Sequence, residues 1–514
     1  MAKADQGEGA EFAGGAVFVE ISERFDKACS AFVLDRRFDR ARAEIGKLDL
    51  DCYEVGGSIR DQLGAGPAKD LDVAVVGSDA AELIYKLSRV GQVTELSVAG
   101  AVIGARLQAS WTPVDGIEFA LARTEVSSGD GHHDFEIVAR PTVSLKEDLA
   151  RRDFTCNAIA APIRSDGSLG PLIDPYRGSE DIAAGELREV GPTTIAEDPL
   201  RALRGFVRVA AKNWQIEAGT LESIKAVSGK LGPDGELSAE RIYAETEKII
   251  RGDHPAQAFR LMRDCGVFAA AYPELAPMVN FDQQSRYHDL PVDEHCFRAL
   301  EVAAANQADP VVRWAALLHD SGKPETAFMG TDDRLHYYRN PLDPDSVAHE
   351  VRSAEISRAL LERFRAPKKF TSEVELLVRN HMFSEDHHLD KRSDTKNRIK
   401  VRRLIRCIGR ENIYRLSELR HCDRLGKTES EDSWQPNRFD QLIDEEINQP
   451  LFNKDLVISG HDLLALGARG PEIGAIQTVL VERVVVNPEM NEPATLLSWA
   501  KKELSRIKRA EQRS

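Results

Sequence analysis

Two aspartates that alternate with apolar residues form the first group able to do chemistry. The segment KDLDV, residues 69–73, places Asp70 and Asp72 two positions apart in what reads as an apolar strand. Because strand side chains alternate between two faces, both carboxylates are expected on the same face. Neighbouring carboxylates repel each other, so one takes up a proton unless a cation neutralises the pair. Hard oxygen ligands suit Mg²⁺, and the pair therefore predicts a magnesium site rather than an exposed strand edge.

A pair of glycines lies shortly before these aspartates. Gly56 and Gly57 follow a short strand and open a predicted helix that includes Ile59–Leu63. Glycine allows a close approach of the backbone, and the free N–H groups at the start of a helix suit a phosphate. Turns use Gly-Gly constantly, so this pair supports a phosphate site only in combination with other motifs.

Arginines recur near acidic residues at two later places. The sequence RRDFT, residues 151–155, carries Arg152, and EDPLRALR, residues 197–204, opens another predicted helix. Within that helix Arg201 and Arg204 are three positions apart and lie on one face. Asp198 is near the start of the same helix, where it can pair with Arg201.

Histidines and aspartates form a second group in the C-terminal half. The doublet His319–Asp320 ends an apolar stretch and precedes Ser-Gly-Lys, which resembles the signature of HD phosphohydrolases. The resemblance implies one metal-binding set of His295, His319, Asp320 and Asp423, with His349 and His381 as ligands of a second metal. Such mixed nitrogen and oxygen donors suit a transition metal such as Mn²⁺, Ni²⁺, Co²⁺ or Fe²⁺. A single histidine is more often structural than functional, but six candidates at matching spacing argue against chance.

Two kinds of element must position these groups. Short β-branched runs separated by glycines predict strands at 53–55, 71–76, 102–107 and 117–121, in a small α/β or α+β unit. From residue 197 onward, apolar residues recur at helical spacing, as in 200–209, 239–250, 299–318, 351–364 and 496–507. A short amphipathic helix is expected at 25–45. The pattern predicts a mixed head followed by an all-helical body.

Length and composition restrict the class of protein. The chain has 514 residues, of which 42% are hydrophobic and 30% charged, as expected for a soluble protein of several domains. No run of 18 apolar residues predicts a transmembrane helix, and the polar N-terminus does not resemble a secretion signal. The seven cysteines are scattered and include no CxxC pair. Reduced thiols and a cytoplasmic location are therefore expected.

The net charge of −16 makes nucleic-acid binding depend on local clusters of cations. Residues 391–410 and 501–509 contain many lysines and arginines. They are either RNA-binding surfaces or solvated helix faces, and the sequence alone favours the second interpretation for any single run.

Five motifs occur in an order that resembles a known family. GGSIRD, KDLDV, RRDFTCNA, EDPLRALR and the segment 239–245 are similar to successive motifs of the class II tRNA nucleotidyltransferases. These are the CCA-adding enzymes and their poly(A) polymerase relatives, within the polymerase-β-like nucleotidyltransferase superfamily. The segment 120–131 most resembles bacterial CCA-adding enzymes with an HD domain. The resemblance covers roughly residues 50–440.

The resemblance implies a role for each matching residue. Asp70 and Asp72 would hold catalytic Mg²⁺ ions, with Glu118 as the third carboxylate. Contacts to the nucleotide triphosphate would come from Gly57, Arg60 and Arg152. Asp198 and Arg201 would pair with the Watson–Crick edge of cytosine or adenine, with Arg204 beside them. Aspartate can accept from the amino groups of both bases, which U and G do not present in the same way.

We therefore expect an α+β fold: a polymerase-β-like head with a small mixed sheet, followed by an all-helical neck, HD domain and tail. The predicted divisions are an N-terminal extension at 1–45, the head at 46–185, the neck at 186–275, the HD domain at 276–440 and the tail at 441–514.

The expected activity is template-independent addition of C and A from CTP and ATP to the 3′ end of tRNA, with an additional phosphohydrolase activity in the HD domain. Three variants of the activity stay open: CC addition, A addition and poly(A) synthesis. They differ in the segment 123–144, which here contains His132, His133 and Arg140 in place of a clear basic motif. The alternative class is a metal-dependent HD phosphohydrolase whose head only binds a nucleotide, and the intact aspartate pair disfavours it. The oligomeric state does not follow from the sequence.

Overall fold

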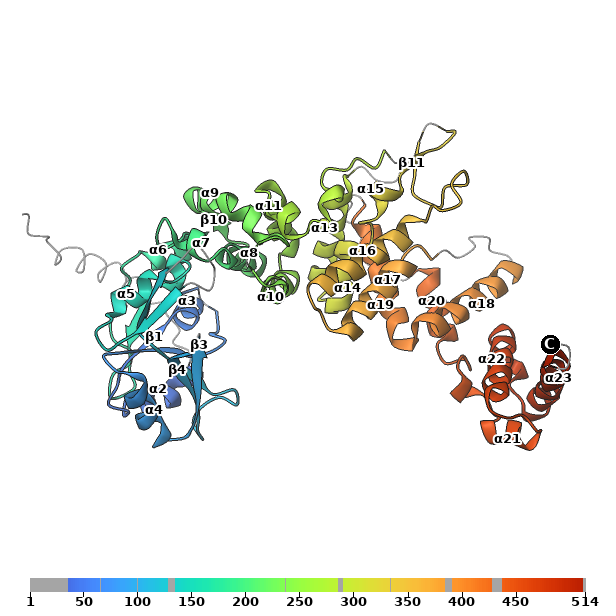
Figure 1. Ribbon diagram of the computed structural model, residues 1–514, viewed down its shortest axis with the longest axis horizontal. Coiled ribbons are helices and arrows are strands. Elements are labelled where there is room, and N and C mark those ends of the chain that lie inside the picture. The colour runs from blue at the N-terminus through green and yellow to red at the C-terminus, as the bar shows by residue number, and fades with distance from the viewer. Residues whose placement is uncertain are drawn as a thin grey trace, which may run out of the picture. The chain divides into compact units, whose positions relative to one another are not determined.

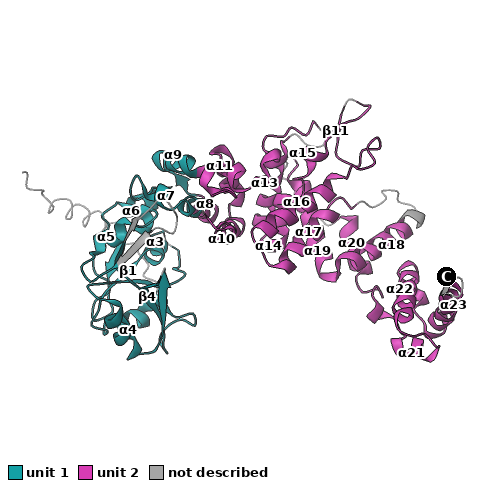
Figure 2. Ribbon diagram, viewed as in Figure 1, with its two compact units in different colours: residues 1–205, 214–227 teal, residues 206–213, 228–514 magenta. Residues whose placement is uncertain are grey.

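The computed structural model describes residues 36–64, 66–98, 100–127, 135–235, 237–284, 290–332, 334–383, 391–427 and 437–511. A mixed α/β part is followed by helices to the end of the chain (Figure 1). The chain divides into two compact units (Figure 2): residues up to 205 with 214–227, and residues 206–213 with 228–514. Among the described residues, no helix is both long and apolar enough to span a membrane. Of the predicted helix at 25–45, residues 25–35 lie outside the described part of the chain.

A mixed sheet organises the first unit. Six strands are ordered β3-β4-β5-β2-β1-β8, with β2 and β5 parallel and the other neighbours antiparallel. The elements are η2 Arg36–Phe38, α2 Asp39–Ile45, β1 Asp51–Val55, α3 Gly57–Leu63, β2 Asp72–Val76, α4 Ala80–Ser88, β3 Gln92–Val98, β4 Ala101–Gln108, β5 Ile117–Leu121, β6 Arg123–Ser127, β7 Phe135–Ala139, α5 Leu145–Ala150, η3 Thr155–Asn157, β8 Ala160–Pro162, α6 Gly178–Ala184, β9 Glu186–Leu187, α7 Thr194–Glu197, α8 Leu200–Lys212, β10 Gln215–Ile216 and α9 Ala218–Val227.

Alternation along β2 and β5 separates the large core on one face of the sheet from the acids, which share the other face with a smaller apolar cluster around Ala74. Val73 and Phe119 are buried in the core with leucines of α4, whereas Asp72 and Glu118 lie on the opposite face. The structure differs from the sequence-based expectation at Asp70, which lies in a bend before the strand because β2 begins at Asp72. The pairing stops there because β1 ends at Val55 and the chain turns away at the next residue.

A buried ionic network fixes α3 against β1. The Arg42 guanidinium of α2 donates from Nε and Nη2 to the Glu54 carboxylate at 2.6 and 3.1 Å. Gln62 of α3 donates to the same carboxylate at 2.7 Å, and the Ser58 hydroxyl donates to it as well. These four side chains are at most 2% exposed. One carboxylate in β1 therefore sets the rotation of α3, the helix that carries Arg60.

Replacement of Arg42 by alanine should destabilise this part of the sheet. The change leaves the Glu54 carboxylate buried without its counter-charge, which costs about 3–5 kcal/mol. Hydrogen exchange of peptides from 39–76 measures this loss in the full-length protein. The matched control is Arg89→Ala, which replaces an exposed arginine after α4 that lies over the Tyr85 ring. Its effect on the free energy of unfolding should stay below about 0.5 kcal/mol. Equal protection in the two variants would show that the buried pair does not support β1 and α3.

Helices form nearly all of the second unit, which includes the end of α8. The elements are η4 Ser228–Leu231, α10 Ala239–Ile250, α11 Pro255–Asp264, α12 Val267–Ala271, η5 Ala276–Met278, α13 Val292–Ala305, α14 Pro310–Leu318, α15 Lys323–Thr326, β11 Phe328–Met329, β12 Leu335–His336, α16 His349–Arg363, α17 Lys368–Asn380, α18 Lys391–Ile408, α19 Arg410–Leu425, α20 Arg438–Glu446, η6 Asn453–Asp455, α21 Gly460–Ala465, α22 Pro471–Val486, η7 Pro488–Met490 and α23 Pro493–Glu511.

The central helix α14 is buried along its length and brings its C-terminal end into the core. Asp309 begins it, because the side chain accepts from the backbone N–H of Val311 at 2.8 Å and proline follows at the first helical position. Every described residue from Val311 to Leu318 is buried, so neighbouring helices surround α14. The residues that follow it, His319 and Asp320, are therefore held inside the unit.

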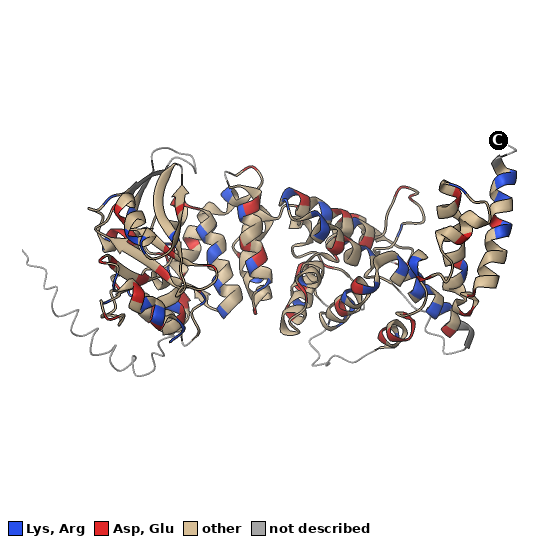
Figure 3. Cartoon of the chain, turned by 90° about the horizontal axis from the view of Figure 1, so that it is seen from below, with Lys and Arg blue, Asp and Glu red and all other residues tan. Residues whose placement is uncertain are grey.

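The basic run 391–410 is largely paired with acids from other helices. Arg398 and Arg402 of α18 both contact Glu446 of α20 at 2.5 Å. Arg403 and Arg406 contact Glu482 of α22 at 2.5 and 3.0 Å. Figure 3 shows basic and acidic residues distributed over the helices of the chain. The run therefore holds α18, α20 and α22 together, a role that neither sequence-based interpretation included.

Candidate functional site

The acidic face of the sheet brings two predicted carboxylates side by side. The parallel register of β2 and β5 makes Asp72 and Glu118 direct neighbours. Burial raises the pKa of Asp72 above its usual value, Arg152 opposes that shift, and the charges of Asp70 and Glu118 add to it. The negative charge of Asp70 therefore raises the pKa of Asp72, although Asp70 lies outside the strand. A cation would relieve the repulsion among the three groups, and their oxygen donors fit Mg²⁺.

The glycine turn lies directly against this acidic group. Gly56 has a φ of +66°, and a Cβ added there would come within 2.8 Å of the Arg152 side chain. A Cβ on Gly57 would lie 3.6 Å from a carboxylate oxygen of Asp72. The first glycine is required by the backbone conformation and by the close approach of Arg152. The turn thus leaves room for a ligand beside Asp72.

Two arginines converge beside the turn. The Arg60 side chain is 6% exposed, and it donates to Asp61 at 2.9 Å and to the side-chain oxygen of Asn157. Arg152 donates to the Asn157 carbonyl at 3.3 Å and to Asp148 at 3.2 Å. Its buried Nε has no hydrogen-bond partner among the described residues. An unsatisfied buried donor at this place fits an anionic ligand.

Sequence reasoning gave no role to Asp148 and Asn157, which hold these arginines. Burial raises the pKa of Asp148, but the Arg151 and Arg152 guanidinium groups outweigh burial and keep it below its usual value. Asp148 of α5 precedes Arg152, which lies just after the end of the helix, by four residues, a helical spacing that could have revealed the pair. The contact of Asn157 with Arg60 spans 97 positions, and no local pattern signals it.

The start of α8 holds the three residues expected to select the base. The Asp198 carboxylate accepts from the backbone N–H of Leu200 at 3.2 Å and so caps the helix. Arg201 is 7% exposed and donates to the Thr194 carbonyl at 3.1 Å. Arg204 is more exposed and lies 3.8 Å from Asp153.

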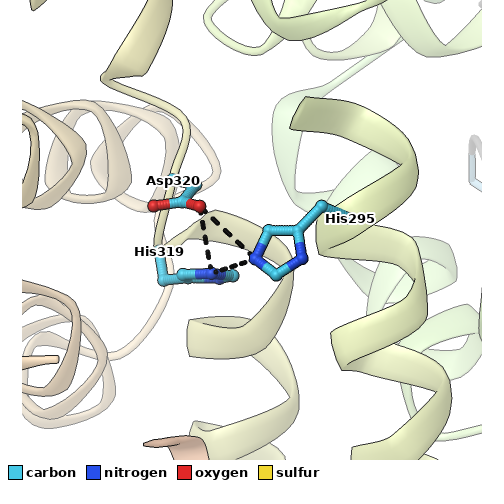
Figure 4. Close-up of side chains that lie close together, drawn as sticks. All are labelled: His295, His319 and Asp320. Carbon is cyan, nitrogen blue, oxygen red and sulfur yellow. Dashed lines mark hydrogen bonds and ion pairs between the residues drawn. The ribbon is translucent and has the colours of Figure 1, made fainter. Parts of the chain in front are cut away.

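Five of the six predicted ligands of the helical body converge around the sixth, Asp320. His295 Nε2 and His319 Nε2 are 3.1 Å apart, and each lies 3.4 Å from Oδ2 of Asp320 (Figure 4). Asp423 of α19 adds a carboxylate oxygen 3.2 Å from His295 Nε2. On the other side, His349 Nε2 and His381 Nε2 lie 3.4 and 3.6 Å from Oδ1 of Asp320. Two groups with metal-ligand spacing therefore share one carboxylate.

Backbone carbonyls orient three of these rings. The Nδ1 atoms of His319, His349 and His381 face the backbone carbonyls of Ala316, Tyr337 and Val378 at 2.9, 3.2 and 2.7 Å. Because a carbonyl only accepts, each Nδ1 carries the proton and donates. The Nε2 atoms then face the Asp320 carboxylate, the arrangement in which a metal ion would lie between each ring and the carboxylate.

Further features of this cluster match a site for cations. His349 Nε2 and His381 Nε2 are buried and have no hydrogen-bond partner among the described residues. Burial lowers the pKa of His381 below its usual value, so that ring is neutral near pH 7. Lys323 lies 2.6 Å from Asp320, so its positive charge offsets the negative charge of the buried carboxylate. The donor set fits a transition metal.

Comparison with known families covers most of the chain. Residues 52–188 match the poly A polymerase head domain, 213–279 match the probable RNA and SrmB-binding site of polymerase A, and 292–406 match the HD domain. The multifunctional CCA protein of Azoarcus sp. strain BH72 is 34% identical over 391 residues, which are 75% of this chain and 86% of that protein.

The chain belongs to the multifunctional CCA protein family.

A second relative agrees with this assignment, and solved structures show the same fold. The multifunctional CCA protein of Xanthomonas campestris pv. campestris strain B100 is 31% identical over 435 residues, 83% of this chain and 95% of that protein. The Bacillus stearothermophilus CCA-adding enzyme in complex with CTP has a TM-score of 0.63 at 21% identity, over 93% of this chain and all of that one. The Thermotoga maritima CCA-adding enzyme complexed with tRNA has a TM-score of 0.53 at 18% identity, over 93% of this chain and 98% of that one. The predicted family and α+β fold class are confirmed.

Proposed function

We propose that this protein adds C and A from CTP and ATP to the 3′ end of tRNA without a nucleic-acid template. The observation that carries the proposal is the Asp72–Glu118 pair beside the glycine turn, with Arg60 and Arg152 converging on the same place. The names of its relatives support the same activity. We further propose a cytoplasmic location, in accord with the absence of disulfides among the described cysteines.

The head requires divalent metal, and we propose Mg²⁺ held by Asp70, Asp72 and Glu118. The metal supplies charge that offsets the phosphoryl group in the transition state. Gly57, Arg60 and Arg152 bind the triphosphate, and the unsatisfied Nε of Arg152 provides one donor for it. Because the protein mainly positions its substrates in this reaction, the fixed orientation of these side chains accounts for their part in catalysis.

The activity can be tested with tRNA that ends at the base preceding CCA. With CTP alone the protein should add two residues, with ATP alone it should add none, and with both it should restore the complete end. Long extension with ATP alone would instead identify a poly(A) polymerase. Addition that stops after two cytidines in the presence of both nucleotides would identify a CC-adding enzyme. Of the segment that distinguishes these variants, His132 and His133 lie outside the described residues.

Base selection is assigned to Asp198 and Arg201, with Arg204 beside them. Asp198→Asn preserves the helix cap, since asparagine caps as well as aspartate, but it replaces an acceptor oxygen by a donor. Arg201→Lys preserves the charge and loses the planar pair of donors. In both variants, discrimination of CTP against UTP should fall about 10- to 100-fold, which corresponds to about 1–3 kcal/mol for one good pair.

The measurement is kcat/KM for each of the four nucleotides, with Glu222→Gln on α9 as the control. Glu222 is exposed and pairs only weakly with Lys225, so its replacement should leave the discrimination unchanged. Unchanged rejection of UTP and GTP in both Asp198→Asn and Arg201→Lys would show that these side chains do not read the base.

We propose a second activity for the HD domain, because two buried imidazole nitrogens face Asp320 and have no hydrogen-bond partner among the described residues. His295, His319, Asp320, His349, His381 and Asp423 would hold one or two transition-metal ions, for which we propose Ni²⁺, Mn²⁺ or Co²⁺. The metal supplies Lewis acidity for phosphoester hydrolysis. We propose as substrate a 2′,3′-cyclic phosphate or a 2′-phosphate at an RNA end.

A further inference from the structure

Arg106 continues the row of charged side chains on the face of the head sheet that carries Asp72 and Glu118. The antiparallel register of β4 and β5 makes it the direct neighbour of Glu118, just as the parallel register makes Asp72 the neighbour of Glu118 on the other side. Directly opposite residues in adjacent strands point to the same face. Arg106 donates to the Glu118 carboxylate, and the two side chains are 46% and 48% exposed.

The residues assigned to triphosphate binding are Gly57, Arg60 and Arg152. They lie at the end of this row that is opposite to Arg106. Strand order across the sheet is β4, β5, β2 and β1, which places Arg106, Glu118, Asp72 and the glycine turn in that sequence. A Cβ on Gly57 would lie 3.6 Å from Asp72 and 3.4 Å from Arg60, whereas one on Gly56 would lie 2.8 Å from Arg152. The row is therefore asymmetric, with two arginines beyond Asp72 and one beyond Glu118.

The asymmetry matters because nucleotidyl transfer proceeds by in-line displacement. The attacking hydroxyl and the departing pyrophosphate occupy opposite sides of the reacting phosphorus. If the triphosphate lies over the β1 side of Asp72, the attacking 3′-hydroxyl enters from the side of β5 and β4. The phosphodiester next to that hydroxyl then lies beyond Glu118, and Arg106 is one strand spacing, about 4.8 Å, further along.

We propose that Arg106 binds the phosphodiester adjoining the 3′-terminal hydroxyl of the RNA substrate. The proposal rests on the proposed function of the head. With a divalent cation at Glu118, the attraction between that carboxylate and Arg106 is offset by cation–cation repulsion, and the guanidinium turns to the RNA. Its planar pair of donors matches two phosphate oxygens. In the absence of substrate, the same guanidinium neutralises Glu118.

Arg106→Gln tests this role through a comparison of the two substrates. The KM for tRNA should rise at least tenfold, while the KM for CTP and the kcat at saturating tRNA should change less than twofold. The slope of log KM for tRNA against log salt concentration should fall by about 0.7–1, as expected for one lost phosphate contact. Arg106→Lys should recover part of the affinity, because it keeps the charge without the planar pair of donors.

Arg89→Gln is the matched control, because it removes an exposed arginine from the end of α4, which packs on the core face of the same sheet. Its KM values and salt slope should equal those of the parent protein. An unchanged KM for tRNA in Arg106→Gln would overturn the proposal, and so would a fall in kcat alone, which would limit Arg106 to orienting Glu118. Absence of addition by the parent protein would instead refute the proposed function.

Discussion

Asp72→Asn should abolish nucleotide addition while tRNA binding survives. The substitution preserves the shape of the side chain but removes a charged ligand of the proposed metal site, which Asp70 and Glu118 complete. We expect the rate of addition to fall at least about 1,000-fold, or about 4 kcal/mol of transition-state stabilisation. Asp70→Asn should have the same effect. Binding of tRNA should remain, because contacts to its backbone away from the reacting phosphate do not use these carboxylates.

The measurement combines single-turnover addition of labelled CTP with filter binding of tRNA. Asp51→Asn is the control, since Asp51 is exposed and lies at the end of β1 distant from the glycine turn. This variant should retain the parent rate. If Asp72→Asn and Asp70→Asn both kept more than a few per cent of that rate, the assignment of the metal site to these residues would be wrong.

Combined replacement of His319 and Asp320 by alanine should remove both the bound transition metal and phosphoester hydrolysis. Asp320 lies at the centre of the cluster, within 3.6 Å of the Nε2 atoms of His295, His319, His349 and His381. Its loss therefore dismantles both groups of ligands at once. Addition of CTP and ATP should stay within about twofold of the parent rate, because the assigned catalytic carboxylates belong to the other compact unit.

Metal analysis of the purified protein and a hydrolysis screen with Ni²⁺, Mn²⁺ and Co²⁺ provide the measurement. His461→Ala serves as the control, because His461 is an exposed histidine of α21. Asp72→Asn should show the converse behaviour, with hydrolysis intact and addition lost. Hydrolysis that persists in the double variant would refute the assignment of this site. A parent protein without metal or hydrolysis would reduce the HD domain to a scaffold for tRNA.

The sequence predicted the residue types of the head site better than their geometry. The alternation of polar and apolar residues identified Asp72 correctly as part of a strand. It also placed Asp70 in that strand, because the period of a sequence does not show where a neighbouring strand ends. Glu118 was reached only through the family resemblance. Its position beside Asp72 depends on the register of two strands that are 46 positions apart in the chain, and no local pattern contains that register.

Contacts between residues that are distant in the chain account for the other features that the sequence did not predict. The arginines of α18 were correctly recognised as a basic cluster, but Glu446 and Glu482, which pair with several of them, come from helices much later in the chain. Arg42 and Glu54 had no motif to mark them, although their pair is fully buried. The candidate metal ligands of the HD domain were predicted through their resemblance to a signature. The sharing of Asp320 between two groups of histidines follows only from the packing of α13, α14, α16 and α17.

Sequencing of product ends tests the central claim most directly. The parent protein is incubated with tRNA lacking its last three nucleotides and with all four nucleoside triphosphates, and the 3′ ends are then read individually. The proposed function requires ends that read CCA and stop there. Homopolymeric tails, ends that stop at CC, or incorporation of U and G at frequencies similar to C and A would contradict it.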